Sequence, residues 1–187
     1  DDRISPGEGF DMHPHKNMEV VSIPLKGYLK HGDSIENQSI ITPGEIQVMS
    51  TGKGIYHSEY NGSNEKDLEL LQIWIIPNKE ETEPEYHNYN ILPLMKHNEL
   101  ATFISPNGNT PAHLLQDAWF SMGTLSANHK VSYHLHKPHT GVYFFIIEGN
   151  VDIADKTLPR RDGIGIWDTE SIIIKTNEES QVLAIEV

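Results

Sequence analysis

The chain has 187 residues, with 27 Asp and Glu against 14 Lys and Arg, which gives a formal net charge of −13. An acidic chain with no stripe of basic residues repels phosphate backbones, so direct nucleic-acid binding and a polybasic membrane-surface role are both disfavoured. Cysteine is absent, which excludes disulfides, thiolate nucleophiles and Cys-ligated zinc. Any metal site must therefore use His, carboxylates or carbonyls, and the 11 histidines are the compositional excess.

The beginning of the chain shows no targeting signal. Asp1–Ser5 does not resemble a signal peptide, and no stretch approaches the roughly 18 consecutive apolar residues of a membrane helix. We therefore expect a cytoplasmic protein without a membrane partner. Because the first residue is not Met, we also expect the natural protein to begin further upstream.

Short apolar runs rich in Val, Ile, Tyr and Phe alternate with Gly, Pro, Asn and Asp, a pattern typical of strands. Helix is scarce, because only the polar region around Leu92–Leu100 could hold a turn or two and Pro93 limits that. Many short strands at close spacing predict an all-β sandwich or barrel. The expected strands are Met18–Leu25, Gln38–Thr42, Ile46–Met49, Leu70–Ile76, Trp119–Leu125, Val131–His136, Tyr143–Ile147, Val151–Ile153, Gly165–Trp167, Ser171–Lys175 and Val182–Ile185.

The two halves of the chain share a pattern of turns and histidines. His13-Pro14-His15 precedes Gly27 and Pro43-Gly44, and His134-Leu135-His136 precedes Gly149 and Asp162-Gly163. Two units of roughly 75 residues with the same order of features indicate an internal duplication, although any all-β chain places Gly at similar intervals. The Glu-, Thr- and Pro-rich composition around Asn78–Pro84 is typical of a connector.

Two pairs of chemically active residues have the i, i+2 spacing of a strand face. His13 and His15 share one face if their segment is extended, and His57 and Glu59 repeat the spacing within Ile55–Tyr60. Three imidazoles and one carboxylate from two strands predict a mononuclear transition-metal site with positions left for water or substrate. Taken singly, such a pair is more often a surface feature than a ligand set.

The same alternation, continued from His15 along the chain, places Glu19 on the face of the two imidazoles. The apolar Val21 and Ile23 share this parity. If they face the barrel interior, Glu19 and the histidines face it too.

Several linked motifs then resemble the pirin family of the cupin superfamily. The resemblance is close to continuous from Asp1 to about Pro77 and looser beyond, where it depends mainly on Asp117-Ala118 and the Gly163 turn. The motifs are Gly9-Phe10-Asp11-Met12-His13-Pro14-His15-Lys16-Asn17-Met18-Glu19-Val20, His31-Gly32-Asp33-Ser34, Pro43-Gly44-Glu45-Ile46-Gln47-Val48-Met49-Ser50, Gly52-Lys53-Gly54-Ile55-Tyr56-His57-Ser58-Glu59-Tyr60-Asn61 and Leu71-Gln72-Ile73-Trp74-Ile75-Ile76-Pro77.

This resemblance implies a bicupin, that is, two jelly-roll-like β-barrels in one chain. We expect an N-terminal metal-binding barrel over residues 1–78, a connector over residues 79–112 and a metal-free C-terminal barrel over residues 113–187. The family ligands fall on His13, His15, His57 and Glu59. Family members usually bind iron, which favours Fe(II), although such donors also accept Mn, Ni, Co, Cu or Zn.

Two departures concern the first barrel. General cupins take their carboxylate ligand from the first motif, which would be Glu19, whereas the pirin pattern uses Glu59. We expect Glu59 to be the ligand and Glu19 a neighbouring or proton-handling group, with the exchanged roles left open. Pro24 interrupts an expected strand, which should therefore lie at an edge or bend there.

Other His and Trp residues are expected to be structural. His134 and His136, with His139 nearby, suggest a second ligand pair, but Thr140 and Thr176 replace the remaining ligands. Surface positions are expected for five histidines and core positions for three tryptophans: His31, His87, His97, His113, His129, Trp74, Trp119 and Trp167.

The resemblance suggests a metal-dependent dioxygenase of the quercetin 2,3-dioxygenase type, which acts on a flavonol or a similar hydroxylated aromatic compound with O₂. Glu59 would then be the base for the substrate hydroxyl, with Glu19 as the alternative. Two competing hypotheses are a non-enzymatic, redox-sensing metal protein that acts through protein partners, and a purely structural metalloprotein. The same ligands serve all three.

Overall fold

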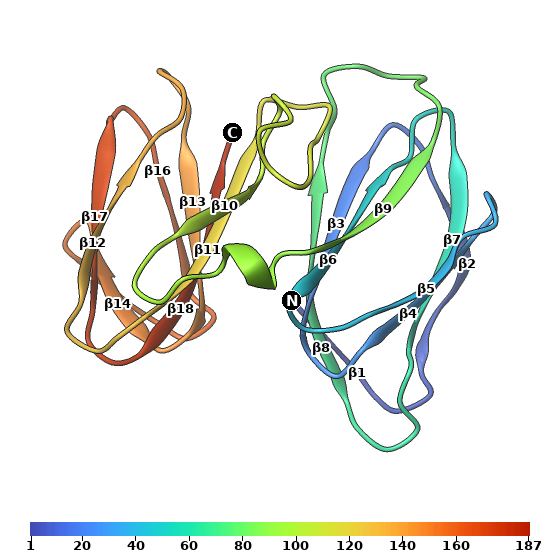
Figure 1. Ribbon diagram of the computed structural model, residues 1–187, viewed down its shortest axis with the longest axis horizontal. Helices are drawn as coiled ribbons and strands as arrows, with labels where there is room; N and C mark the ends of the chain where they lie inside the picture. Colours follow the sequence, from blue (N-terminus) through green and yellow to red (C-terminus); the bar gives the residue numbers. More distant parts are fainter. The chain divides into compact units, whose positions relative to one another are not determined.

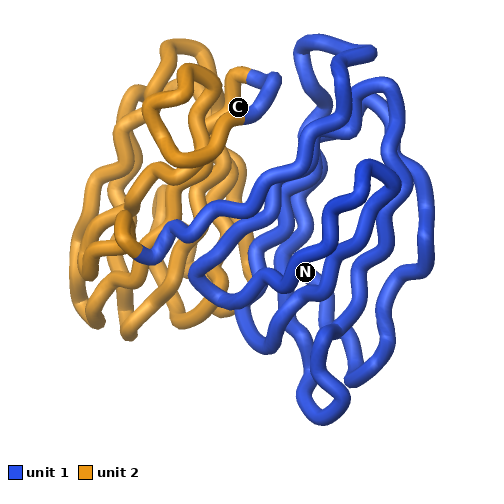
Figure 2. The backbone as a smooth tube through the Cα atoms, turned by 45° about the vertical axis from the view of Figure 1, so that its right-hand side comes forward, with its two compact units in different colours: residues 1–92, 114–116 blue, residues 93–113, 117–187 orange.

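The computed structural model describes all residues, 1–187, and confirms the all-β prediction. The chain forms 18 strands and one short 3₁₀ helix, η1 (Leu92–Leu94). Two compact units divide it: unit 1 comprises residues 1–92 and 114–116, and unit 2 comprises residues 93–113 and 117–187 (Figure 2). None of the helical structure is long and apolar enough to cross a membrane.

Unit 1 is built from two antiparallel sheets that enclose an interior (Figure 1). The five-stranded sheet has the order β1-β8-β3-β6-β9, and the four-stranded sheet has the order β2-β7-β4-β5. The strands are β1 (Asp2–Ile4), β2 (Gly9–His15), β3 (Glu19–Lys26), β4 (Leu29–Asp33), β5 (Gln38–Ile41), β6 (Glu45–Ser50), β7 (Ile55–Asn61), β8 (Leu68–Ile75) and β9 (Glu85–Asn90).

Unit 2 repeats this plan. Its sheets have the orders β10-β11-β18-β13-β16 and β12-β17-β14-β15. The strands are β10 (Ala101–Ile104), β11 (Trp119–Leu125), β12 (Lys130–His134), β13 (Val142–Glu148), β14 (Asn150–Ile153), β15 (Lys156–Pro159), β16 (Gly163–Ile166), β17 (Ser171–Thr176) and β18 (Ser180–Glu186).

The strand orders confirm the internal duplication. The order β2-β7-β4-β5 of unit 1 recurs as β12-β17-β14-β15 in unit 2, and β8-β3-β6 recurs as β18-β13-β16. Each of the strands β1 to β8 therefore has a counterpart ten strands later, among β11 to β18. The chain forms the two barrels of the predicted bicupin.

Residues 79–112, the expected connector between the barrels, supply one strand to each unit. β9 pairs with β6 along its whole length, from Glu85 to Asn90, and β10 pairs with β11. The β9 sequence, Glu-Tyr-His-Asn-Tyr-Asn, contains no aliphatic residue, because this edge strand is mostly exposed. Hydrophobic patterning consequently does not reveal it.

Pro24 lies where the sheet becomes irregular. β3 is a central strand between β8 and β6, but its pairing with β6 ends at Ser22. Its register with β8 then shifts between Pro24 and Lys26. The bend predicted at Pro24 is present, and the edge position is not, because the missing N–H falls beyond the reach of β6.

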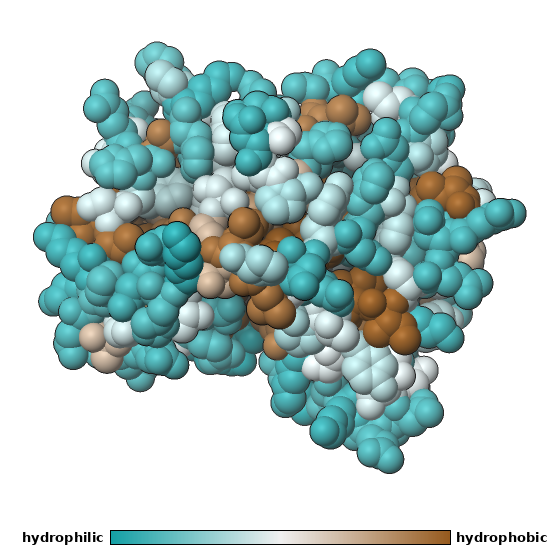
Figure 3. Space-filling view, in the orientation of Figure 1, coloured by the Kyte–Doolittle hydropathy of each residue, from teal (hydrophilic) through white to brown (hydrophobic).

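The interiors of the two units differ in chemistry. Unit 2 is filled by aliphatic and aromatic side chains, among them Phe144, Ile172 and Ile174. Unit 1 has smaller apolar clusters, one around Leu29 and one around Val20. The rest of the interior of unit 1 contains buried polar groups. On the surface, hydrophilic residues cover most of the face of the molecule drawn in Figure 3.

Only one tryptophan occupies the core position expected for all three. Trp119 is buried, whereas Trp74 is 54% exposed and Trp167 is 69% exposed. Trp167 follows the end of β16, where no neighbouring strand covers it. Strand-like patterning identifies aromatic residues in sheets but does not tell which face of a sheet is solvated.

Candidate metal centre

The pairing of three strands brings the candidate ligands together. On one side of β7, His57 is the cross-strand partner of His13 in β2. On its other side β7 pairs with β4, where Glu59 lies opposite His31 and His57 lies opposite Asp33. Directly paired residues point to the same side of a sheet. A register shift in β2 between Phe10 and His13 inserts an extra residue just before the two histidines, as β-bulges often do beside functional sites.

Three imidazoles form a compact group, as the parity of the strands predicted. The ring centroids of His13 and His57 lie 4.4 Å apart, and His15 lies 4.9 Å from each of them. One potential ligand atom from each residue lies within 4.8 Å of the other two. This separation is within the reach of a single cation after small side-chain adjustments.

The electrostatics of the group favour neutral imidazole. Burial, followed by the charges that His13, His15 and His31 could hold, lowers the pKa of His57 to about 3. Burial, followed by the neighbouring His13, also lowers the pKa of His15. Both rings are therefore neutral at neutral pH and offer lone pairs, the state in which histidine binds metals.

The hydrogen bonds of the three rings leave ring nitrogens available to bind a metal. His57 is fully buried, yet neither Nδ1 nor Nε2 has a hydrogen-bond partner, and neither has Nε2 of His15. Nδ1 of His13 lies 2.7 Å from the carbonyl oxygen of Asp11, which can only accept, so Nδ1 donates and Nε2 presents the lone pair. Unsatisfied buried nitrogens are costly, and a cation would satisfy them.

Glu59 lies deeper in the barrel, held by three side chains of the opposite sheet. Its Oε1 accepts hydrogen bonds from Gln47 Nε2 at 2.9 Å and Ser22 Oγ at 3.3 Å, and its Oε2 accepts one from Gln72 Nε2 at 2.5 Å. Glu59 is 2% exposed. One of its carboxylate oxygens and one ring nitrogen from each of His57 and His31 all lie within 4.8 Å of one another. The other three residues predicted as ligands thus lie around His57.

Glu19 does not face this interior, which corrects the parity prediction. Its Oε2 accepts a 2.7 Å hydrogen bond from the backbone N–H of Leu115, whereas Val20 and Ser22 of the same strand contact the interior groups. The physical reason is Asn17, whose φ of 51° turns the chain between β2 and β3. The two strands belong to different sheets, so alternation starts anew after the turn.

His31 is a functional candidate that was expected at the surface. It is 1% exposed, its ring stacks on Tyr86 with centroids 4.3 Å apart, and its Nε2 lies 3.1 Å from Asp33 Oδ2. Its polar sequence neighbours suggested exposure. The signal that could have identified it is the i, i+2 spacing of Leu29, His31 and Asp33. In this pattern a buried apolar residue is followed, on the same strand face, by two residue types common in metal and catalytic sites.

Trp74 lies beside the imidazole group at a solvent-accessible position. Its ring is 4.9 Å from that of His15 in an edge-on arrangement, and its Nε1 donates a 3.0 Å hydrogen bond to Gln72 Oε1. Because Trp74 is 54% exposed, it provides an aromatic surface between the histidines and solvent.

In unit 2 the counterpart positions hold other chemistry. β17, the counterpart of β7, directs Ile172 and Ile174 into the apolar core. His134 and His139 are exposed, and His136 Nδ1 lies 2.7 Å from the buried carboxylate of Glu186. Both groups of potential metal ligands in the structure lie in unit 1.

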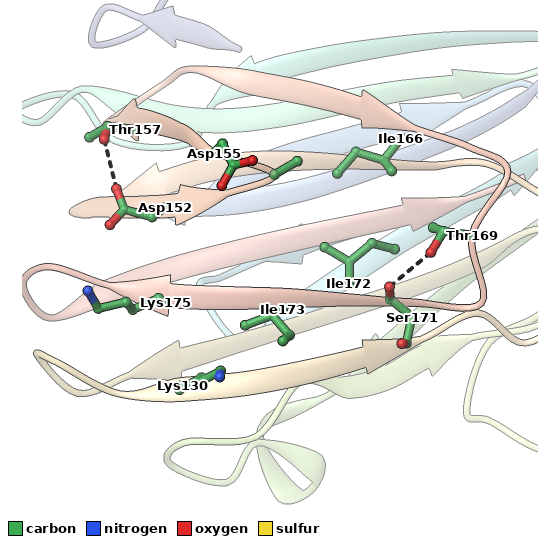
Figure 4. Close-up of a pocket in the computed structure, with 11 residues that line it drawn as sticks. Lys130, Asp152, Asp155, Thr157, Ile166, Thr169, Ser171, Ile172, Ile173 and Lys175 are labelled. Atoms are coloured by element: carbon green, nitrogen blue, oxygen red, sulfur yellow. Dashed lines mark hydrogen bonds between the residues drawn. The ribbon is translucent and has the colours of Figure 1, made fainter.

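A surface groove of about 820 Å³ lies on unit 2 (Figure 4). It is lined by side chains of β12, β14, β15 and β17, including Lys130, Lys175 and Asp152. Asp152 accepts a 2.8 Å hydrogen bond from Thr157. None of the predicted ligands lines it.

Two family models match the chain. The model described as Pirin matches residues 1–75, and the model described as Quercetinase C-terminal cupin domain matches residues 102–187. These ranges cover the candidate ligands and most of unit 2.

Similar proteins come from several bacteria. A protein of Escherichia coli (strain K12) named quercetin 2,3-dioxygenase is 34% identical over 187 residues, which is 100% of this chain and 80% of that protein. A crystal structure of the bacterial pirin YhhW from Escherichia coli in complex with nickel(II) has a TM-score of 0.92 and 32% identity, covering 100% of this chain and 79% of that one. By sequence and by fold, the chain belongs to the pirin family of bicupins.

Proposed function

We propose that the chain is a metal-dependent dioxygenase that acts on a small, planar, hydroxylated aromatic compound, a flavonol such as quercetin. The main support is the group of His13, His15 and His57 beside the carboxylate of Glu59. His15 and His57 are neutral imidazoles and have buried nitrogens without a hydrogen-bond partner. The likeness to a protein named quercetin 2,3-dioxygenase supplies the substrate class and O₂ as the second substrate.

In this proposal the three histidines bind the metal and Glu59 is the fourth ligand. The nickel(II) complex of a similar pirin supports a divalent metal. We propose Fe(II) as the native metal, while the same donors accept Mn, Ni, Co, Cu or Zn. A bound divalent metal would supply Lewis acidity toward the substrate hydroxyl and, if redox-active, electrons for O₂.

The side chains of unit 1 would prepare the substrate. Glu59 is the base that takes the proton of the substrate hydroxyl onto a carboxylate oxygen. Gln47 and Gln72 hold that carboxylate in place from the opposite sheet. Trp74 offers an aromatic ring against which a flat substrate can pack beside His15.

Metal analysis combined with oxygen uptake tests this proposal. The purified protein should contain one divalent metal per chain and consume O₂ in the presence of quercetin, and His57→Ala should lose both properties. His87→Ala is the matched control, because His87 lies in the same unit but its side chain is exposed on β9. Turnover that survives His57→Ala would overturn the catalytic proposal. Metal binding without any turnover, together with metal-dependent capture of a protein partner, would favour the non-enzymatic regulator instead.

A further inference from the structure

His31 has a ring orientation fixed by its neighbours. Asp33 accepts hydrogen bonds from the backbone N–H groups of Ile35 and Asn37, each at 3.0 Å, and from the Asn37 side chain. A carboxyl group with this many donors is a carboxylate and can only accept. Nε2 of His31, 3.1 Å away, therefore carries the hydrogen and donates to Asp33.

The other ring nitrogen of His31 then points a lone pair into the barrel. Nδ1 is buried and has no hydrogen-bond partner, and the side chain as a whole is 0% exposed. Stacking on Tyr86, with the ring planes inclined by 17°, limits rotation of the imidazole. An acceptor in this position requires a donor or a cation.

Neither of the two buried groups beside this lone pair, Glu59 and His57, makes a hydrogen bond to it. Glu59 accepts hydrogen bonds at both of its oxygens, from Gln47, Gln72 and Ser22, which suits a carboxylate with no hydrogen to donate. His57 has two unpartnered nitrogens of its own. One potential ligand atom from each of His31, His57 and Glu59 lies within 4.8 Å of the other two, and all three residues are buried.

We infer that unit 1 has a second, inner position for a divalent transition metal, formed by His31 Nδ1, His57 and Glu59, with Asp33 orienting His31. It shares His57 and Glu59 with the outer position at His13 and His15, so it is an alternative position for the same single ion. Two imidazoles and a carboxylate suit Co(II), Ni(II) or Zn(II), and a histidine that donates its second N–H to a carboxylate is the usual arrangement around bound metals. The inference rests on the proposal that His57 binds metal, but it does not require turnover.

A variant without the outer ligands tests the inner position. We expect the double variant His13→Ala/His15→Ala to keep one equivalent of Co(II) in equilibrium dialysis, with visible absorption from the bound ion. Adding His31→Ala should lower that affinity at least about 100-fold, whereas adding the exposed His87→Ala should leave it unchanged. A double variant that binds no Co(II), or one whose affinity is the same with and without His31, overturns the inference.

Truncation of a buried ring can also destabilise the barrel, so a second variant keeps the ring. Asp33→Asn in the double variant can donate to Nε2 and so place the hydrogen on Nδ1, and we expect it to lower the Co(II) affinity about 10–100-fold. Circular dichroism verifies that each variant remains folded. An unchanged affinity for Asp33→Asn contradicts the orienting role. Absence of quercetin turnover in the unmodified protein affects only the proposed function, because this test measures binding.

Discussion

Gln72 donates a 2.5 Å hydrogen bond from Nε2 to Oε2 of Glu59, and so connects the two sheets of unit 1 across the candidate site. Gln72 also accepts a hydrogen bond from Trp74. A single amide thus joins the exposed aromatic ring to the buried carboxylate. The position of Glu59 consequently depends on the opposite sheet as well as on its own strand.

Replacing Gln72 tests this dependence. Gln72→Leu removes the donor to Glu59 while keeping a side chain of similar volume, and we expect metal affinity and turnover to fall about 10–100-fold, as for other residues that orient metal ligands. Isothermal titration with Ni(II) measures the affinity. The conservative Gln72→Glu cannot donate and should not restore it, whereas Gln72→Asn should restore it in part. Undiminished affinity in Gln72→Leu would contradict the positioning role.

Glu59→Gln separates the two roles proposed for this carboxylate. The amide keeps the shape of the side chain but neither ligates strongly nor accepts the substrate proton. If Glu59 is a ligand, metal content after dialysis should fall together with turnover. Retained metal with turnover lost would mean that Glu59 acts mainly as the base. Glu19→Gln is the comparison, and because Glu19 is bonded to Leu115 on the other face of β3, we expect the metal content to be unchanged.

Trp74→Ala should weaken substrate binding more than it slows the reaction. Trp74 contacts His15 and is 54% exposed, so it is available to a flat aromatic compound, and Gln72 separates it from the buried carboxylate of Glu59. Loss of an aromatic contact of about 0.5–1.5 kcal/mol corresponds to a KM about 2–10-fold higher with kcat little changed. Trp167→Ala in unit 2 is the matched control. Equal losses in the two variants would exclude a specific role for Trp74.

Unit 2 should lose stability in acid because of Glu186. Burial raises the pKa of this carboxyl, but hydrogen bonds from His136, Thr140 and Tyr133 outweigh it and hold the pKa below its usual value. Its stabilising contribution is therefore complete above the unfolded pKa of about 4.3 and is lost as the pH falls through the lower folded value. Glu186→Gln should cost about 1–3 kcal/mol near pH 7 and flatten this acid dependence.

Urea unfolding at several pH values, followed through amide NMR signals of unit 2, measures the effect. Glu178→Gln, an exposed carboxylate on the same unit, should leave the pH profile unchanged. A profile for Glu186→Gln as steep as that of the unmodified chain would contradict this assignment.

The apolar filling of unit 2 can be tested without disturbing the metal ligands. Ile174 is fully buried in the core of unit 2, so Ile174→Ala should lower the free energy of unfolding of that unit by about 2–5 kcal/mol. Because the candidate ligands belong to unit 1, the Ni(II) affinity of the folded protein should not change. A metal affinity that falls in parallel with stability would mean that the ligands depend on the unit 2 core.

The amino-acid sequence alone predicts the two-barrel architecture and the two residue pairs that each share one face of a strand, in β2 and in β7. His13 with His15, and His57 with Glu59, are each two residues apart within one strand, and strand geometry alone places such pairs on one face. The apolar runs identified most strands for the same reason, since a half-buried strand shows its burial in its own pattern.

Tertiary structure decided what depends on neighbouring strands or on turns. Glu19 lies on the other face from the one predicted, because Asn17 turns the chain between two sheets. The alternation of side chains along one strand does not continue across such a turn. His31 entered the site through the register of β4 against β7, which sets it opposite Glu59. Trp74 lies on the same side of β8 as Gln72, but near the end of the strand, where it is 54% exposed beside His15. The register between strands and the solvent exposure of a sheet face depend on contacts between segments far apart in the chain. They cannot be predicted from the residues of one strand.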